Sequence, residues 1–309
     1  MPETRTSPML HPGDRVRLVS PASYPDADWL DESRHILESW GLVVDVADHA
    51  LDEWGYMAGR DHERAADLND AFLDPTVRAI VTTRGGAGAY RIADLVDVDA
   101  VRRDPKPLAG FSDITYLHLV LWGRCGLASV HGCLAGPTAV SSLRRSLMSL
   151  EPAVLAQVPE AMSAAIEVEG EATGPLMGGS LTAVAGSVGA GLPDLDGAIL
   201  FLEQPRTIGL GQVDRAITHL IRSGALDGIA GVALGLFTGF DDYRDRGWDL
   251  LDVLRDRLNG LGVPVLGGLF AGHGGVGPDG GPDQQAVPLG TMATLDTTAG
   301  TLTVEPCVQ

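Results

Sequence analysis

The strongest candidate for chemistry in this chain is a serine, Ser112, which follows a short apolar run. Residues 108–111 predict a strand and the apolar periodicity from Ile114 predicts a helix, so Ser112 stands at a sharp turn. A serine at such a turn presents its Oγ, and the N–H groups that open the next helix can stabilise an oxyanion, which suits acyl transfer. Gly110 and Ser112 match the pattern G-x-S-x-G, whereas Ile114 replaces its second glycine. The alternative is that Ser112 only caps the helix, with Asp113 in its first turn.

A second candidate feature is a glycine-rich turn, Gly85-Gly86-Ala87-Gly88, which follows the β-branched run 77–83 and could bind a negatively charged group. Glycines let backbone N–H groups approach an anion closely, so the turn is a candidate donor to a developing oxyanion. The alternative is a tight strand-to-helix turn with a structural role alone. The spacing G-x-G-x-x-G is absent and no Lys-Ser or Lys-Thr pair follows, so the turn predicts no nucleotide or dinucleotide cofactor.

Two further polar side chains, Glu203 and His273, follow apolar strands in the second half of the chain. Glu203 closes the run 198–202, and His273 lies among glycines after the run 263–266. α/β folds place sites at strand ends, and an imidazole with a pKa of about 6.5 suits a general base. Each also has an ordinary interpretation, as a solvated carboxylate or a loop histidine without a role. His118, within an apolar helix, is predicted to be a core or interface residue.

Strands and helices alternate through the first half of the chain, which predicts an α/β domain with a mainly parallel sheet. The expected strands are residues 14–20, 42–47, 77–83, 108–111 and 128–132, and the expected helices are residues 28–40, 61–73, 114–122 and 141–156.

The second half of the chain has a different pattern of expected elements, which begins with short β segments between residues 158 and 173. We therefore predict one domain over residues 1–157, carrying the serine, and another over residues 158–309, carrying the acid and the histidine. The expected elements of the second domain are strands at 197–203 and 228–237, a helix at 211–223, and β strands with turns over 287–304. This pattern predicts α+β or barrel-like character.

The composition indicates a globular protein whose partner is neither a nucleic acid nor a membrane. The 309 residues carry a formal net charge of −19, which repels phosphate backbones and anionic lipid surfaces. No signal-type or membrane-spanning apolar segment is predicted, so we expect a cytoplasmic protein. The three cysteines, Cys125, Cys133 and Cys307, are too few for a disulfide framework, and no Cys/His spacing predicts a metal site.

Taken together, these segments resemble the LD-carboxypeptidase family of serine peptidases. The segments that carry the resemblance are Arg84-Gly85-Gly86, residues 110–115, His131-Gly132, residues 197–203, Asp214-Arg215, Gly272-His273-Gly274, and Pro288-Leu289-Gly290 with Leu295-Asp296. The family includes muramoyltetrapeptide carboxypeptidases, which remove the terminal D-Ala from an L,D bond of peptidoglycan tetrapeptides, and the related microcin C self-immunity proteins. The resemblance implies a flavodoxin-like or Rossmann-like N-terminal domain, a swivelling, barrel-like C-terminal domain, a site at their interface, and a homodimer.

The resemblance also implies roles for single residues. Ser112 is the nucleophile, His273 the base that takes its proton, and Glu203 the acid that orients the imidazole. The oxyanion hole is formed by the backbone N–H of Asp113 and that of Gly85 or Gly86, between which the sequence does not choose. No metal or organic cofactor is implied. An arginine suits a substrate carboxylate, and the candidates are Arg84, Arg206 and Arg91.

The function that the resemblance implies is hydrolysis of murein tetrapeptide by a serine carboxypeptidase during peptidoglycan recycling. One alternative is an amidase of the microcin-immunity type, acting on an aminoacyl-nucleotide analogue. Another is an inactive binding homologue, against which the presence of Ser112, Glu203 and His273 argues.

Overall fold

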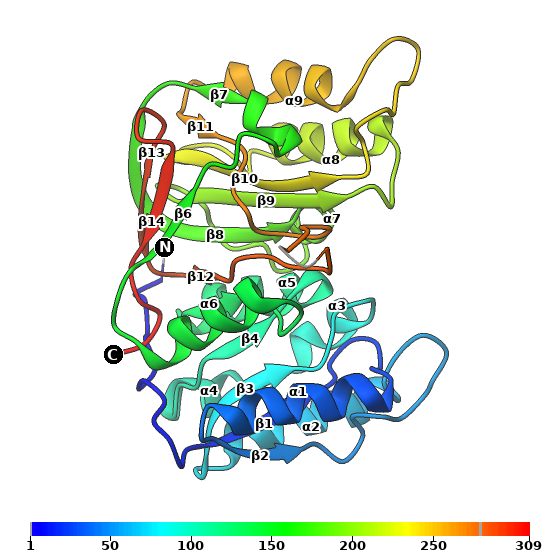
Figure 1. The fold of residues 1–309 in the computed structure, drawn as a ribbon, viewed down its shortest axis with the longest axis vertical. Helices are drawn as coiled ribbons and strands as arrows, with labels where there is room; N and C mark the ends of the chain where they lie inside the picture. The colour runs from blue at the N-terminus through cyan, green and yellow to red at the C-terminus, as the bar shows by residue number, and fades with distance from the viewer. Residues whose placement is uncertain (1, 278–279) are drawn as a thin grey trace.

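The first of two sheets in this computed structural model, which describes residues 2–277 and 280–309, is six-stranded, and Figure 1 shows it below the second. Its strand order is β12-β5-β4-β3-β1-β2, and all neighbours are parallel except β12 and β5. The strands are β1 (Arg15–Val19), β2 (Val43–Val46), β3 (Val77–Thr82), β4 (Leu108–Gly110), β5 (Ser129–His131) and β12 (Val287–Leu289). The helices of this half are α1 (Ala27–Ser39), α2 (Asp61–Leu73), α3 (Ala89–Ile92), α4 (Val98–Arg103), α5 (Thr115–Cys125) and α6 (Pro137–Met148), with 3₁₀ turns η1 (Ala93–Leu95) and η2 (Ser112–Ile114).

The second sheet has eight strands in the order β6-β14-β13-β8-β9-β10-β11-β7. Its strands are β6 (Ala153–Ala156), β7 (Glu167–Val168), β8 (Glu171–Ser180), β9 (Ile199–Pro205), β10 (Gly231–Thr238), β11 (Val265–Leu266), β13 (Met292–Asp296) and β14 (Thr301–Val304). Its helices are α7 (Leu181–Gly186), α8 (Leu210–Arg222) and α9 (Leu250–Leu258), with 3₁₀ turns η3 (Met162–Ala165) and η4 (Asn259–Leu261). β8 to β11 are parallel to one another and the outer pairs are antiparallel. The predicted α/β class is confirmed, and within the described residues the second sheet remains open, with β6 and β7 at its edges.

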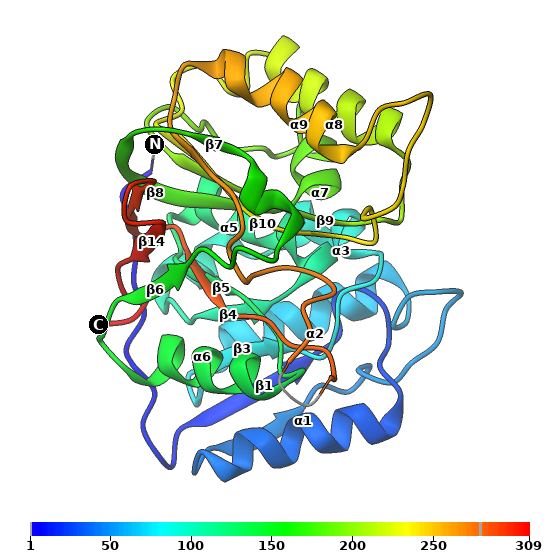
Figure 2. The same ribbon diagram turned by 45° about the horizontal axis from the view of Figure 1, so that its top comes forward.

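Burial explains why these segments form their elements. β3 is apolar and buried along nearly its whole length, as expected of a central parallel strand covered on both faces. α8 buries one stripe, Leu210, Val213, Ile217 and Leu220, and turns its polar face outward. Figures 1 and 2 show α8 and α9 at the end of the molecule opposite α1. The buried apolar residues form three clusters: two lie mainly in the first half, and the third joins the second sheet to Leu119 and Trp122 of α5.

One predicted element is wrong. The single helix expected over residues 141–156 is instead α6, which ends at Met148, followed by the strand β6. Pro152 stands between them, and proline has no N–H for the helical ladder and disfavours helical geometry in the residue before it.

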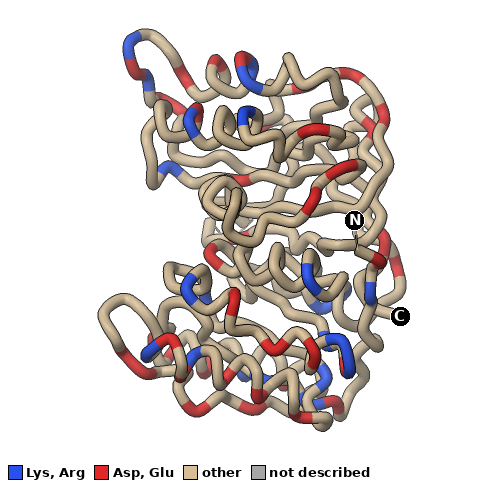
Figure 3. Tube along the Cα trace, turned by 180° about the vertical axis from the view of Figure 1, so that it is seen from behind, with Lys and Arg blue, Asp and Glu red and all other residues tan. Residues whose placement is uncertain are grey.

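The chain crosses between the two sheets more than once. β6, which lies before the predicted division at 157/158, pairs with β14 of the second sheet, and β12 returns from the second half to pair with β5. The division between residues 157 and 158 stays a prediction. Acidic residues lie on both halves, as Figure 3 shows. Among the described residues, none of the helices has the length and hydropathy needed to cross a bilayer.

Candidate active site

The structure brings the three side chains singled out by the sequence into one chain of hydrogen bonds. His273 Nε2 lies 2.9 Å from Ser112 Oγ, and His273 Nδ1 lies 2.7 Å from Glu203 Oε2. The backbone N–H of His273 also donates to Glu203 Oε2, at 3.1 Å. Because a carboxylate can only accept, Nδ1 carries the proton in this arrangement and Nε2 is left to accept one from the serine hydroxyl.

Ser112 sits at a strained corner. Its φ is +65°, in the left-handed region that residues other than glycine rarely adopt and that costs them about 1–2 kcal/mol. β4 ends at Gly110 and the 3₁₀ turn η2 begins at Ser112 itself, so the hydroxyl projects at the point where the chain reverses. The Thr115 hydroxyl donates to the Ser112 carbonyl at 2.7 Å and fixes this turn from the helix side. The sharp strand-to-helix turn predicted from the sequence is therefore present.

Of the two glycines left open by the sequence, Gly85 is the one that lies against this corner. A Cβ built on Gly85 would lie 2.6 Å from both the Phe111 carbonyl oxygen and Ser112 Cβ, and 3.2 Å from the Asp113 nitrogen. A Cβ on Gly86 would instead meet Ser23 Oγ at 2.3 Å. The backbone of Gly85 is thus close to the Asp113 N–H, with room at this point only for a glycine.

The Asp113 carboxylate ties the glycine-rich turn to the serine corner. Its Oδ2 accepts a hydrogen bond from the Ala89 N–H at 2.7 Å, one residue after the turn ends. Burial raises the pKa of Asp113 to about 6, against which the hydrogen bonds from the Ala89 and Gly88 backbone act. The guanidinium of Arg64, itself buried, supports the same turn by donating to the Gly88 carbonyl at 2.9 Å.

A buried histidine beneath Glu203 had no role assigned from the sequence. Glu203 and His131 are both fully buried, and His131 Nε2 lies 3.9 Å from Glu203 Oε1, beyond hydrogen-bond distance. The His131 ring packs edge-on against Phe111 and Phe201. Burial lowers the pKa of His131 well below its usual value, so this imidazole is neutral at pH 7. The sequence signal that could have identified His131 is the one used for Glu203: each lies at the end of an apolar strand.

His118 is a core residue, as its place in an apolar helix predicted. The ring is fully buried, Nε2 lies 3.1 Å from the Gly110 carbonyl oxygen, and burial lowers its pKa to about 4. A neutral imidazole donates to that carbonyl, and this bond holds the last residue of β4 directly before the serine corner.

The three candidate arginines have different surroundings. Arg84 is exposed, lines a cavity beside the serine corner, and donates to the Tyr24 carbonyl at 3.3 Å. Arg206 follows β9 and stacks its guanidinium over the ring of Tyr243, 3.9 Å from the centroid. Arg91 is held by a two-pronged ion pair with Asp61, so its guanidinium already has a carboxylate partner.

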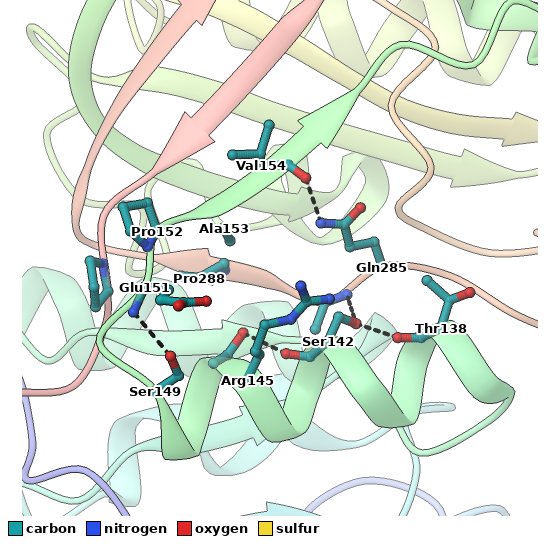
Figure 4. A pocket seen from close by; sticks show the side chains of 13 residues that line it. Thr138, Ser142, Arg145, Ser149, Glu151, Pro152, Ala153, Val154, Gln285 and Pro288 are labelled. Atoms are coloured by element: carbon teal, nitrogen blue, oxygen red, sulfur yellow. Dashed lines mark hydrogen bonds between the residues drawn. The ribbon is translucent and has the colours of Figure 1, made fainter.

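A second cavity, of about 240 Å³, lies between α6 and the start of β6 (Figure 4). It is lined by Ser142, Arg145 and Gln285 among others, and by none of the predicted catalytic residues. No cluster of His, Cys, Asp and Glu suited to a metal ion occurs in the part of the chain that the structure describes. The three cysteines are free.

Two family descriptions match most of the chain. Residues 16–132 match the LD-carboxypeptidase N-terminal domain, and residues 173–295 match the LD-carboxypeptidase C-terminal domain.

Curated relatives match along nearly their full length. A Streptomyces coelicolor protein that carries a carboxypeptidase name is 37% identical over 309 residues, covering 96% of this chain and 94% of the relative. The "Probable murein peptide carboxypeptidase" of Bacillus subtilis is 32% identical, with 96% and 93% covered. The "Murein tetrapeptide carboxypeptidase" of Pseudomonas aeruginosa is 30% identical, with 91% and 93% covered.

Solved structures share the fold. The muramoyltetrapeptide carboxypeptidase of Oxalobacter formigenes has a TM-score of 0.81 at 24% identity, covering 96% of this chain and all of the other. The microcin C7 self immunity protein MccF, in complex with aspartyl sulfamoyl adenosine, has a TM-score of 0.81 at 21% identity, with 97% and 98% covered.

Proposed function

The chain belongs to the LD-carboxypeptidase family, and we propose that it is a serine carboxypeptidase that releases the terminal D-Ala of murein tetrapeptide. The observation that carries the proposal is the chain of hydrogen bonds from Ser112 through His273 to Glu203. Two relatives that match over nearly the whole chain are named for carboxypeptidase activity on murein peptides. The bond cleaved is the L,D bond before the last residue, a reaction of peptidoglycan recycling.

Acylation follows from the positions of the three side chains. Ser112 Oγ attacks the scissile carbonyl while His273 Nε2 takes its proton, and Glu203 stabilises the imidazolium that results. The N–H groups of Asp113 and Gly85 receive the negative charge on the tetrahedral oxygen. The C–N bond then breaks, His273 returns the proton to the amine of D-Ala, and the tripeptide remains as an ester on Ser112.

Deacylation reverses these roles with water. His273 removes a proton from a water molecule that attacks the ester, and Ser112 leaves with that proton. The free tripeptide carboxylate is the second product. Every step uses groups of this chain, the substrate and one water molecule.

An amidase of the microcin-immunity type is the second candidate, because MccF has the same fold over nearly the whole chain. At 21% identity that likeness supports the fold alone, and it carries less weight than the relatives named for murein peptides. An inactive binding homologue is disfavoured by the hydrogen-bonded state of Ser112. A cytoplasmic homodimer, which the resemblance to the family implies, completes the proposal.

Product analysis by mass spectrometry tests the function. Purified protein is incubated with murein tetrapeptide and, in parallel, with an aminoacyl sulfamoyl adenosine, and Ser112→Ala serves as the control. We expect D-Ala from the tetrapeptide with the parent protein and none with the variant. Cleavage of the adenosine compound alone would contradict the carboxypeptidase function and support an amidase of the microcin-immunity type.

A further inference from the structure

A cavity of about 150 Å³ lies beside the serine corner and has no part in the triad. It is formed where β3, β4 and β5 end and is closed on one side by α1; its walls include Trp29, Thr83, Phe111 and Cys133. The carboxyl ends of parallel strands are where sheets of this class bind ligands. The indole of Trp29 is fixed as a wall, because its Nε1 donates to the Thr83 carbonyl at 2.8 Å.

Two wall residues connect the cavity to the catalytic groups. The ring of Phe111 lies against the imidazole of His273, with 4.2 Å between the centroids, so Phe111 borders both the cavity and the base. Gly85 also lines the cavity and touches the Ser112 corner. His273 delivers a proton to the leaving amine, so the leaving group must lie on the His273 side of the bond.

Arg84 supplies a positive charge at this cavity. Its guanidinium is exposed, and its hydrogen bond in the described structure goes to a backbone carbonyl at a long 3.3 Å. It forms no ion pair with a described carboxylate, although the chain as a whole has a net charge of −19. Arg64 and Arg91, by contrast, are both paired with Asp61. An unpaired guanidinium suits a ligand carboxylate, which it can bind through two N–H groups.

We propose that this cavity is the leaving-group subsite and that it takes one small residue with a free α-carboxylate, bound by Arg84. The proposal rests on the proposed carboxypeptidase function and adds the reason for cleavage at the last residue. A cavity of 150 Å³ has the size at which engineered cavities admit benzene, and alanine has the same number of non-hydrogen atoms. A larger terminal residue exceeds this space, and a longer chain lacks the carboxylate at this position.

The test compares substrates that differ only at the terminus. Wild type and Arg84→Met are assayed on the tetrapeptide with a free D-Ala carboxylate and on its C-terminal amide. We expect Arg84→Met to lower kcat/KM for the free acid by about 10- to 100-fold, the worth of a charge-assisted hydrogen bond, and to leave kcat/KM for the amide unchanged. Equal loss on both substrates would overturn the role of Arg84.

The matched control is Arg145→Met, an exposed arginine on α6 that lines the separate cavity of Figure 4. It removes the same charge from this acidic protein, and we expect it to keep the preference for the free acid. Size is tested with wild type by replacing the terminal D-Ala with D-Leu, which should lower kcat/KM by about 10-fold or more because the cavity must expand. Equal rates for the two termini would contradict the assignment of the cavity.

A binding measurement separates this proposal from the proposed function. The rate at which a fluorophosphonate labels Ser112 is measured with added D-alanine or D-alaninamide. D-Alanine should slow labelling of wild type and not of Arg84→Met, and D-alaninamide should slow neither. If D-alanine has this effect while the tetrapeptide is not cleaved, the subsite stands and the murein substrate is wrong. If the tetrapeptide is cleaved and D-alanine has no effect, the subsite is wrong and the function stands.

Discussion

Replacing Gly85 with alanine adds one methyl group between the glycine-rich turn and the serine corner. The new carbon would lie 2.6 Å from Ser112 Cβ and from the Phe111 carbonyl oxygen, where ordinary contacts begin at 3.4 Å. The φ of Gly85 is not in the left-handed region, so alanine introduces a steric conflict without a dihedral one. The turn and the corner must therefore separate by about 0.8 Å, which widens the space between the two N–H groups of the proposed oxyanion hole.

This displacement sets the expected loss of rate. Weakening or removing one oxyanion donor costs about 10²- to 10³-fold in kcat, and a misplacement near 1 Å costs about 10²-fold. We therefore expect Gly85→Ala to lower kcat by about 10²-fold, equivalent to about 2.7 kcal/mol of transition-state stabilisation. The cost to stability should be about 1–3 kcal/mol, as for overpacking elsewhere, so the protein remains folded.

The assay measures kcat from D-Ala release and Tm by circular dichroism on the same preparation. The control is Gly211→Ala in α8, where an added Cβ meets no atom within 4 Å and φ is again not positive. This control should keep the wild-type kcat, with an equal or higher Tm because alanine favours helix. A folded Gly85→Ala protein with kcat within about threefold of wild type would refute the placement of Gly85 in the oxyanion hole.

Three further predictions concern the elements around the serine. Ser112→Gly should be inactive yet about 1 kcal/mol more stable to urea than Ser112→Ala, because glycine relieves the left-handed strain at φ +65°. Equal stabilities of the two variants would show that the backbone at this position is not strained. Glu203→Gln should keep the fold and lower kcat by about 10⁴-fold, as loss of the orienting carboxylate does in other triads, whereas the exposed control Glu171→Gln should match wild type. His118 has a pKa of about 4 in the folded protein and about 6.5 in the unfolded chain, so the unfolded state binds the extra proton and the stability falls as the pH drops. The free energy of unfolding should fall by about 2 kcal/mol between pH 7 and pH 5. His118→Met should show a shallower decline when urea titrations are compared at the two pH values.

The helices and strands that are best predicted from the sequence are those whose burial follows from local apolar periodicity. The helix predicted at residues 61–73 is α2, and the strand predicted at 77–83 is β3, because apolar spacing and β-branched runs report burial directly. The sharp turn at Ser112 was also predicted, since its flanking strand and helix are both strongly apolar.

Long-range pairing is what the sequence could not supply. β12 is a three-residue strand whose partner, β5, lies far away along the chain, and nothing local in Val287–Leu289 identifies that partner. The choice between Gly85 and Gly86 depended on which backbone faces Ser112 across the fold. The place of His131 beneath Glu203 likewise depends on the meeting of two sheets, since β5 belongs to the first and β9 to the second.

Detection of the acyl-enzyme is the most direct way to identify Ser112 as the nucleophile. Turnover of murein tetrapeptide is quenched with acid in the steady state, and the protein is digested and mapped by mass spectrometry. We predict an adduct of the tripeptide acyl group on the peptide that contains Ser112, formed together with free D-Ala and absent from Ser112→Ala. D-Ala release that continues in Ser112→Ala, or an adduct on another residue, would contradict the assignment of Ser112 as the nucleophile.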